Sequence, residues 1–226
     1  DAFRPYAKAG DVIIYLCFST GIAGTYNAAN IAKETLSEEY PDFDLTIIDS
    51  KCASAGFGLL VAKLVTMLEK GAPKEEIIEA ADYFISHIRH VFTVQTLAYL
   101  IKGGRLTKFK GTLAETLDMK PVLVVNESGA LAVIKTVRGR KKSLRYLIDY
   151  ARENGYCLEK QTVALCHGED PEALAMVSSL VQETFHPKNT MISVVGCAIG
   201  AHTGRGLVGF CFFDADEGKY AHYFAD

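Results

Sequence analysis

Hydrophobic positions in the first half of the chain predict buried strands that alternate with helices. Val12–Phe18 is apolar at consecutive positions, which is typical of a strand covered on both faces, as in a parallel sheet. A helical pattern then runs to about Glu39, Leu45–Ile48 is the next expected strand, and Gly58–Glu69 is expected to be helical. Strands and helices in alternation predict a parallel α/β core.

The second half shows a different pattern. Two apolar runs, Pro121–Val125 and Ala130–Val137, flank a glycine-containing turn, so they are expected to form a hairpin. The elements expected after it are a helix over Lys141–Asn154, a strand over Val163–Cys166, a helix over Pro171–Glu183, and strands over Ile192–Val195 and Leu207–Phe213. A hairpin mixed with helices predicts a mixed or antiparallel sheet.

These two patterns together predict a two-domain α/β protein. Residues 1–95 are expected to form an N-terminal domain around the parallel sheet, and residues 96–226 a C-terminal domain around the mixed sheet. The boundary is expected near residues 92–97. Asp1–Gly10 reads as the end of a helix that leads directly into a buried strand. We therefore expect the first part of the N-terminal domain to be absent from this chain.

The loop Ser19–Thr25 is the first candidate binding segment. It joins a buried strand to a helix, and the free backbone N–H groups of a helix start can hold an anion. The hydroxyls of Ser19, Thr20 and Thr25 add further donors. The loop fits neither a Walker motif nor G-x-G-x-x-G. It predicts a generic anion or carboxylate site, with an ordinary helix start as the alternative.

Two further segments carry candidate ligand groups. His202 lies in the glycine-rich stretch Gly196–Gly209, which we expect to be a loop between two apolar strands. Glycine lets a backbone approach a ligand closely, and histidine can donate a hydrogen bond or carry a charge near neutral pH. Arg105 follows two glycines at the end of a short helical pattern, where a guanidinium can clamp a carboxylate or phosphate. An incidental turn histidine and a solvated arginine are the alternatives.

Other polar features receive structural interpretations. Asp49 and Ser50 end a strand, and their side chains are suited to capping the next helix. The basic run Lys135–Lys142 is either a solvated face or a docking face for an acidic partner. His87 and His90 lie three residues apart on an expected helix, but no further ligand lies nearby in sequence. No metal site is therefore expected.

Composition excludes several classes of function. The formal net charge is −3, and the chain lacks the basic footprint of a nucleic-acid-binding protein. The six cysteines are scattered without a C-x-x-C pair, which favours a reducing, cytoplasmic setting. No apolar run reaches the roughly 18 residues of a membrane span, so no integral membrane association is expected. Ser19, His202 and Asp49 all lie in expected loops, but the G-x-S-x-G elbow of serine hydrolases is absent.

Several motifs, in order, resemble those of the DegV family. Residues 19–28 resemble that family's Ser-Ser-Gly-Leu-Ser-Gly-Thr-Tyr segment, and Ile48–Lys51 resembles its Asp-Ser-Lys step. Residues 96–106 are similar to its Thr-Leu-Glu-Tyr-Leu-Lys-Lys-Gly-Gly-Arg-Ile segment. Lys120-Pro121, Lys135–Lys142 and Ile199–Gly204 continue the match. Because the motifs agree across essentially the whole chain, together they are more specific than any one of them.

The resemblance implies a two-domain DegV-like fold that binds one long-chain fatty acid in an apolar tunnel, without any other cofactor. It further implies a non-enzymatic carrier, like the acyl-carrying subunit of a bacterial fatty acid kinase, whose separate kinase subunit phosphorylates the bound carboxylate. By resemblance, His202 is expected at the carboxylate. Arg105 and Arg138 are expected to steer the head group or to dock the kinase.

The chain departs from the family pattern at the head group. The family serine that contacts the carboxylate aligns with Ala23, so Ser19, Thr20 or the backbone N–H of Gly24 is expected to substitute for it. The family's upstream Thr-Ser-Gln-Pro motif would lie before Asp1. Arg205 stands where the family often has proline, and it adds positive charge.

Two other functions stay open on the residues alone. The first is an enzyme that acts on a small phosphorylated or carboxylated compound held by the same loops and Arg105. The second is a regulatory binding module that uses Lys135–Lys142.

Overall fold

The computed structural model describes residues 1–106 and 118–225. Its first part is a two-stranded parallel sheet of β1 (Ile13–Cys17) and β2 (Leu45–Asp49), in register from the first residue of each strand to the last. Helix α2 (Thr25–Glu39) connects the strands, and the short helix α1 (Arg4–Ala9) precedes them. The predicted parallel pairing of the first two strands is confirmed.

A mixed six-stranded sheet forms the larger part of the molecule. Its strands are β3 (Ile88–Thr93), β4 (Met119–Val125), β5 (Leu131–Arg138), β6 (Thr162–Gly168), β7 (Asn189–Val194) and β8 (Leu207–Phe213). The order in the sheet is β5-β4-β3-β8-β6-β7. Only β6 and β7 pair in parallel, and the other neighbours are antiparallel. The predicted hairpin and the predicted mixed sheet are both confirmed.

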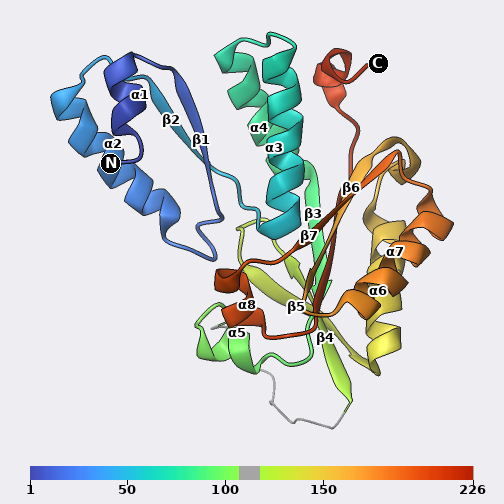
Figure 1. Ribbon diagram of the computed structural model, residues 1–226. Helices are drawn as coiled ribbons and strands as arrows, with labels where there is room; N and C mark the ends of the chain where they lie inside the picture. Colours follow the sequence, from blue (N-terminus) through green and yellow to red (C-terminus); the bar gives the residue numbers. More distant parts are fainter. Residues whose placement is uncertain (107–117, 226) are drawn as a thin grey trace.

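Helices cover both faces of the six-stranded sheet (Figure 1). On one face lie α3 (Ser54–Glu69) and α4 (Lys74–His87), and on the other lie α6 (Arg140–Asn154) and α7 (Pro171–Phe185). Each pair of helices buries its own hydrophobic cluster against the sheet. The central strand β8 is buried at all seven positions, which explains why its sequence is continuously apolar.

Local chemistry explains where several of these helices begin. At α7, Asp170 Oδ1 accepts the backbone N–H of Ala173 at 3.1 Å, and Pro171 occupies the first turn. Two predictions at other helix ends are wrong. Asp49 and Ser50 do not cap α3, because that helix starts at Ser54. Asp49 instead accepts a hydrogen bond from the backbone N–H of Lys51 at 3.1 Å. Ser50 Oγ accepts one from the backbone N–H of Cys52, also at 3.1 Å.

The expectation that His87 and His90 share a helix is also wrong. Helix α4 ends at His87, and the chain enters β3 at the next residue. The segment Ile88–Thr93 contains three β-branched residues, which favour an extended backbone. His90 therefore lies inside the sheet, directly opposite Cys211 of β8.

The prediction that the glycine-rich stretch before β8 is a loop is wrong in part. Residues Cys197–Thr203 form a short helix, α8, between Gly196 and Gly204. It packs against the equally short α5 (Ala98–Lys102). Gly204 has φ of +70°, and a Cβ there would lie 2.6 Å from the ring of Tyr99. Glycine is required at this position because two helices meet, and not because a ligand approaches the backbone.

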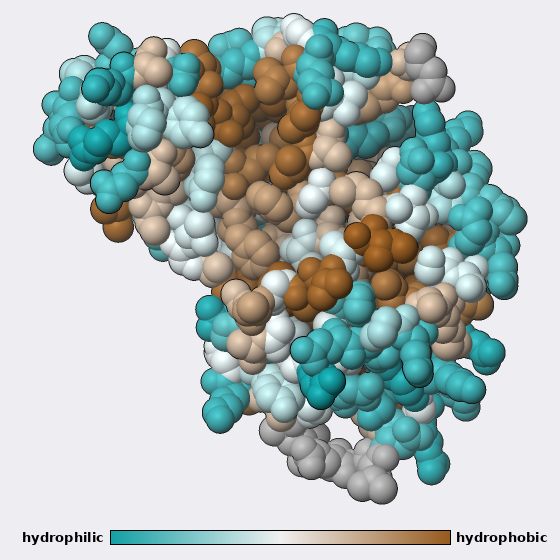
Figure 2. Space-filling model, in the orientation of Figure 1, coloured by the Kyte–Doolittle hydropathy of each residue, from teal (hydrophilic) through white to brown (hydrophobic). Residues whose placement is uncertain are grey.

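The six-stranded sheet draws on both sides of the boundary expected near residues 92–97. Strand β3 precedes that boundary, yet it lies between β4 and β8. The division into domains 1–95 and 96–226 stays a prediction. Hydrophobic side chains gather along the hollow between the β1–β2 part and the rest of the molecule (Figure 2). Among the helices in the described ranges, none combines the length and apolar character that a membrane crossing needs.

Candidate functional site

A cavity of about 510 Å³ lies where the β1–β2 part meets the six-stranded sheet. The loop after β1, the start of α3, strands β3 and β8, and helix α8 all contribute to its wall. Most of the lining is apolar, with side chains such as Phe18, Ile22, Phe92, Leu100, Val125, Leu131, Ile199 and Leu207. Its size falls in the usual range of sites that bind small molecules.

Three polar residues of the lining define what we call the polar end of the cavity: Arg105 and His202, which both lie against Gly103, and Thr25, three residues after the Ile22 carbonyl that Arg105 contacts. Arg105 donates from Nε to the carbonyl of Ile22 at 3.1 Å and from its guanidinium to the carbonyl of Gly103 at 2.7 Å. Within the described ranges, no carboxylate forms a salt bridge with it. These two contacts hold the Arg105 guanidinium at the wall of the cavity.

The start of α2 contributes to the same end. Ala23 and Thr25 line the cavity, and Gly24 between them is the first flanking residue of the helix, without a side-chain cap. The first backbone N–H groups of a helix have no partner within it, and they carry partial positive charge. The helix start, the Thr25 hydroxyl and the Arg105 guanidinium therefore form a donor-rich, cationic environment that suits a carboxylate.

His202 reaches the polar end from α8 through a close contact with Gly103. A Cβ built on Gly103 would lie 2.1 Å from His202 Nδ1 and 3.1 Å from the carbonyl oxygen of Tyr99. Arg105 contacts the same Gly103, so this glycine lies between the two candidate head-group residues. The sequence placed both residues beside glycines, and the structure brings them together in one cavity.

Gly103→Ala is expected to displace His202 and weaken carboxylate binding about tenfold, since one charged or strong hydrogen bond is worth that much. Gly103 has φ of −77°, so alanine causes no backbone strain there. The measurement is the affinity for the long-chain fatty acid that the family resemblance leads us to expect, together with the melting temperature. Gly200→Ala on α8 is the matched control, because no atom lies within 4 Å of its added Cβ. Equal affinities in the two variants would contradict this placement of His202.

The other predicted carboxylate ligands have different positions. Ser19 is fully buried, and its Oγ donates to the carbonyl of Gly129 at 2.7 Å. Thr20 Oγ1 donates to Asp49 Oδ2 at 2.5 Å, and its backbone N–H donates to Asp49 Oδ1 at 3.1 Å. Neither residue lines the cavity. These hydroxyls instead attach the β1–α2 loop to the β4–β5 turn and to the end of β2.

Arg138 also lies away from the cavity, at the exposed end of β5. The neighbouring Arg140 is engaged elsewhere, since it pairs with Asp170 at 2.8 Å and donates to the carbonyl of Gly206 at 2.5 Å. The expected role of Arg138 in docking a partner stays a prediction, separate from the head-group site.

His90 lines the same cavity from β3. Its side chain is 5% exposed, and burial lowers its pKa from 6.5 to about 4, with a smaller contribution from the neighbouring Arg89 charge. The backbone N–H of Ala53 donates to Nε2 at 3.4 Å. Sequence reasoning missed this residue because it placed His90 on the preceding helix; the β-branched composition of Ile88–Thr93 was the available signal.

This buried imidazole makes stability depend on pH in a defined direction. The unfolded chain takes up a proton near pH 6.5 that the folded chain refuses until about pH 4, so the stabilising difference is complete above 6.5 and is lost as the pH falls toward 4. The size of the loss is about 3 kcal/mol. His90→Leu is expected to flatten urea-unfolding stability over this range. The exposed His222→Leu is the control, and an unchanged slope in His90→Leu would refute the assignment.

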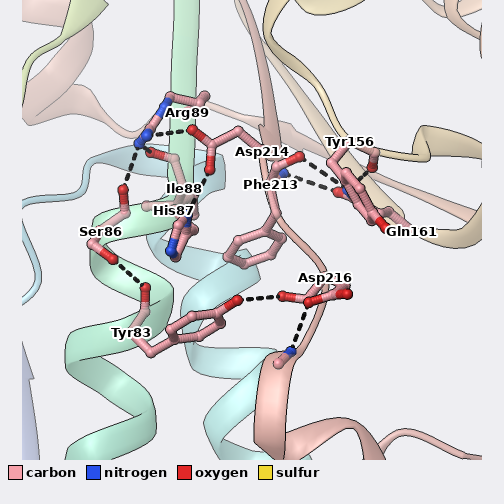
Figure 3. Close-up of polar contacts among 11 residues, drawn as sticks. Tyr83, Ser86, His87, Ile88, Arg89, Tyr156, Gln161, Phe213, Asp214 and Asp216 are labelled. Atoms are coloured by element: carbon pink, nitrogen blue, oxygen red, sulfur yellow. Dashed lines mark hydrogen bonds and ion pairs between the residues drawn. The ribbon is translucent and has the colours of Figure 1, made fainter.

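A separate polar network lies outside the cavity (Figure 3). Asp214 accepts from His87 Nδ1 at 2.8 Å and pairs with Arg89, while Tyr83 donates to the carbonyl of Asp216 at 3.1 Å. The network joins the end of α4 and β3 to the segment after β8. In the described part of the chain, no three histidine, cysteine or acidic side chains are grouped to hold a metal ion.

Comparisons with known proteins agree with this architecture. A family model described as "Uncharacterised protein, DegV family" matches residues 1–215. A DegV domain-containing protein of Clostridium perfringens is 35% identical over 212 residues, which cover 94% of this chain and 73% of that protein.

Solved structures show the same fold. A stearic acid-binding protein from Eubacterium ventriosum superposes with a TM-score of 0.83 at 29% identity, covering 93% of this chain and 73% of that one. The Fatty Acid Kinase (Fak) B3 protein of Streptococcus pneumoniae, loaded with linoleic acid, gives 0.82 at 25% identity, covering 94% and 76%. With a family model that spans nearly the whole sequence and a relative that is 35% identical across it, this chain belongs to the DegV family.

Proposed function

We propose that this chain binds one long-chain fatty acid, with the acyl tail in the 510 Å³ cavity and the carboxylate at the polar end. The observation that carries the proposal is an apolar cavity whose wall includes Arg105, which has no salt-bridge partner among residues 1–106 and 118–225. A buried carboxylate is costly unless donors meet it, and Arg105, His202, Thr25 and the start of α2 supply them. The tail contributes about 0.8 kcal/mol for each buried CH₂.

Relatives support the same ligand class. The neighbours from Eubacterium ventriosum and Streptococcus pneumoniae bind stearic and linoleic acid, and a DegV family protein from Eubacterium eligens was solved with heptadecanoic acid. The cavity lining supports a fatty acid over a small phosphorylated compound. Most of the wall is apolar, and a small phosphorylated compound has no apolar chain to pack against it. Within the described residues, we see no nucleophile paired with a base in the cavity.

The second part of the proposal is a carrier role. The bound carboxylate is presented to a separate kinase that forms an acyl phosphate, and this chain itself performs no chemistry. The likeness to the Fak B3 protein supports this role. All six cysteines are free, which supports a cytoplasmic setting for such a transfer.

Native mass spectrometry of gently purified protein tests the ligand. The expected result is a one-to-one complex with a C16 to C18 acid, and saturable binding when that acid is added back to delipidated protein. If the protein contains no co-purified lipid and shows no saturable binding of the added acid, the proposal is rejected. Turnover of a small phosphorylated compound by the chain alone would favour an enzyme instead.

A further inference from the structure

His90 is a polar side chain of the cavity lining, in a part whose other side-chain heteroatoms are the Ser54 hydroxyl and the thiols of Cys166 and Cys211. On β3, His90 and Phe92 alternate with Val91, so they share the face that is turned toward α3. Gly56 of α3 leaves room for the ring, because a Cβ there would lie 2.1 Å from His90 Nε2. The imidazole is thus held on the cavity side of the sheet.

One nitrogen of this ring has no hydrogen-bond partner among residues 1–106 and 118–225. The backbone N–H of Ala53 donates to Nε2, so the neutral ring carries its proton on Nδ1. No hydrogen bond from Nδ1 exists to any residue in the described ranges. Among the described residues, Nδ1 is not one of the enclosed polar atoms that lack a partner, so it is open to the space beside the ring, where a plain hydrocarbon tail would offer its N–H no acceptor.

The sheet register places His90 at a defined depth. His90 lies opposite Cys211, and Leu207, four residues earlier on β8, borders the cavity just after the helix that carries His202. Four strand residues span about 13 Å, so His90 lies that far along β8 from Leu207, at the end of the strand that follows α8 and His202. This depth corresponds to the middle of an extended acyl chain of sixteen to eighteen carbons.

We propose that the cavity selects a fatty acid with a hydroxyl or oxo oxygen near the middle of its chain, and that His90 Nδ1–H donates a hydrogen bond to that oxygen. This inference rests on the proposed function, since it narrows the class of fatty acid for the same cavity. Cys166 and Cys211 line the cavity near His90, and their sulfurs are weak acceptors for a hydroxyl proton. An oxo group needs no such acceptor.

His90 also borders a second, more polar hollow of about 990 Å³, together with Asp49, Lys51 and Arg89. Water there is the competing partner for the ring N–H. If water satisfied it, an oxygen in the middle of the acyl chain would gain nothing from His90. The experiment therefore compares the position of the oxygen along the chain.

Calorimetric titration of delipidated protein with octadecanoic, 10-hydroxyoctadecanoic, 10-oxooctadecanoic and 6-hydroxyoctadecanoic acids tests the inference. The two acids oxygenated at position 10 are expected to bind about tenfold more tightly than the 6-hydroxy acid, whose oxygen lies against apolar wall. Equal affinities for the 6- and 10-substituted acids would overturn the inference. Failure of all four acids to bind would overturn the proposed function, whereas binding of all four with equal affinity would overturn only the inference, so the two failures are distinguishable.

Variants assign the preference to the residue. His90→Leu is expected to remove the preference for position 10, so that the 6- and 10-substituted acids bind equally, whereas His90→Gln, which keeps an N–H donor, retains part of the preference. His222→Leu, at an exposed histidine, is the matched control and keeps the full preference. A preference that survives in His90→Leu would overturn the role of this side chain. If His90→Leu does not fold, the positional series on the unaltered chain still decides.

Discussion

Replacing Arg105 with methionine is expected to weaken fatty-acid binding by one to two orders of magnitude. The guanidinium lies at the cavity wall without a carboxylate partner in the described residues, and its two backbone contacts hold it in place. A hydrogen bond to a charged group contributes about 1.5–3 kcal/mol, and each 1.4 kcal/mol is a factor of ten in affinity. Methionine keeps much of the apolar bulk and removes the charge.

The measurement is the dissociation constant for octadecanoic acid by calorimetry. Arg105→Lys keeps the charge and loses the planar fork, so an intermediate affinity is expected. Arg145→Met removes an exposed arginine on α6, away from the cavity, and is the matched control with unchanged affinity. An Arg105→Met variant that binds as tightly as the unaltered chain would mean that the carboxylate lies elsewhere.

Leu131→Trp is expected to block the cavity and reduce affinity ten- to hundredfold while the protein remains folded. Leu131 of β5 lines the cavity, and the larger ring would occupy space that the acyl tail needs. Each displaced CH₂ removes about 0.8 kcal/mol, so the loss of two or three gives this range. Overpacking of a filled core destabilises by about 1–3 kcal/mol, but here the ring enters open volume.

Ile134→Trp on the same strand is the matched control, because Ile134 is 41% exposed and lies outside the cavity lining. Both variants are compared by octadecanoic acid affinity and by melting temperature. The prediction is contradicted if Leu131→Trp retains full affinity, or if it loses affinity only because its melting temperature collapses.

The pattern of apolar residues predicted the strands well because burial on both faces leaves a continuous hydrophobic signal. Residues 207–213 show this most clearly, since all seven are buried in the centre of the sheet. The surroundings of His90 and His202 were harder to predict. Helix α8 is only seven residues long, and it is held by packing against α5 rather than by its own glycine-rich sequence.

The polar loops that supply the proposed head-group residues were predictable from the sequence, but the individual contacts of their side chains were not. Ser19 and Thr20 carry the hydroxyls that the motif offered, yet the first bonds Gly129, which is 110 residues away, and the second bonds Asp49, at the end of the neighbouring strand. Thr25, Arg105 and His202 are left to line the cavity. Which hydroxyl is free depends on the tertiary fold, and local sequence does not encode it.

A co-crystal structure with octadecanoic acid tests the central claim most directly. The account predicts that a carboxylate oxygen lies within hydrogen-bond distance of Arg105 or His202, and that the tail runs past Leu131 toward His90. Electron density for the acid outside this cavity, or side chains that close the cavity in the liganded crystal, would contradict it.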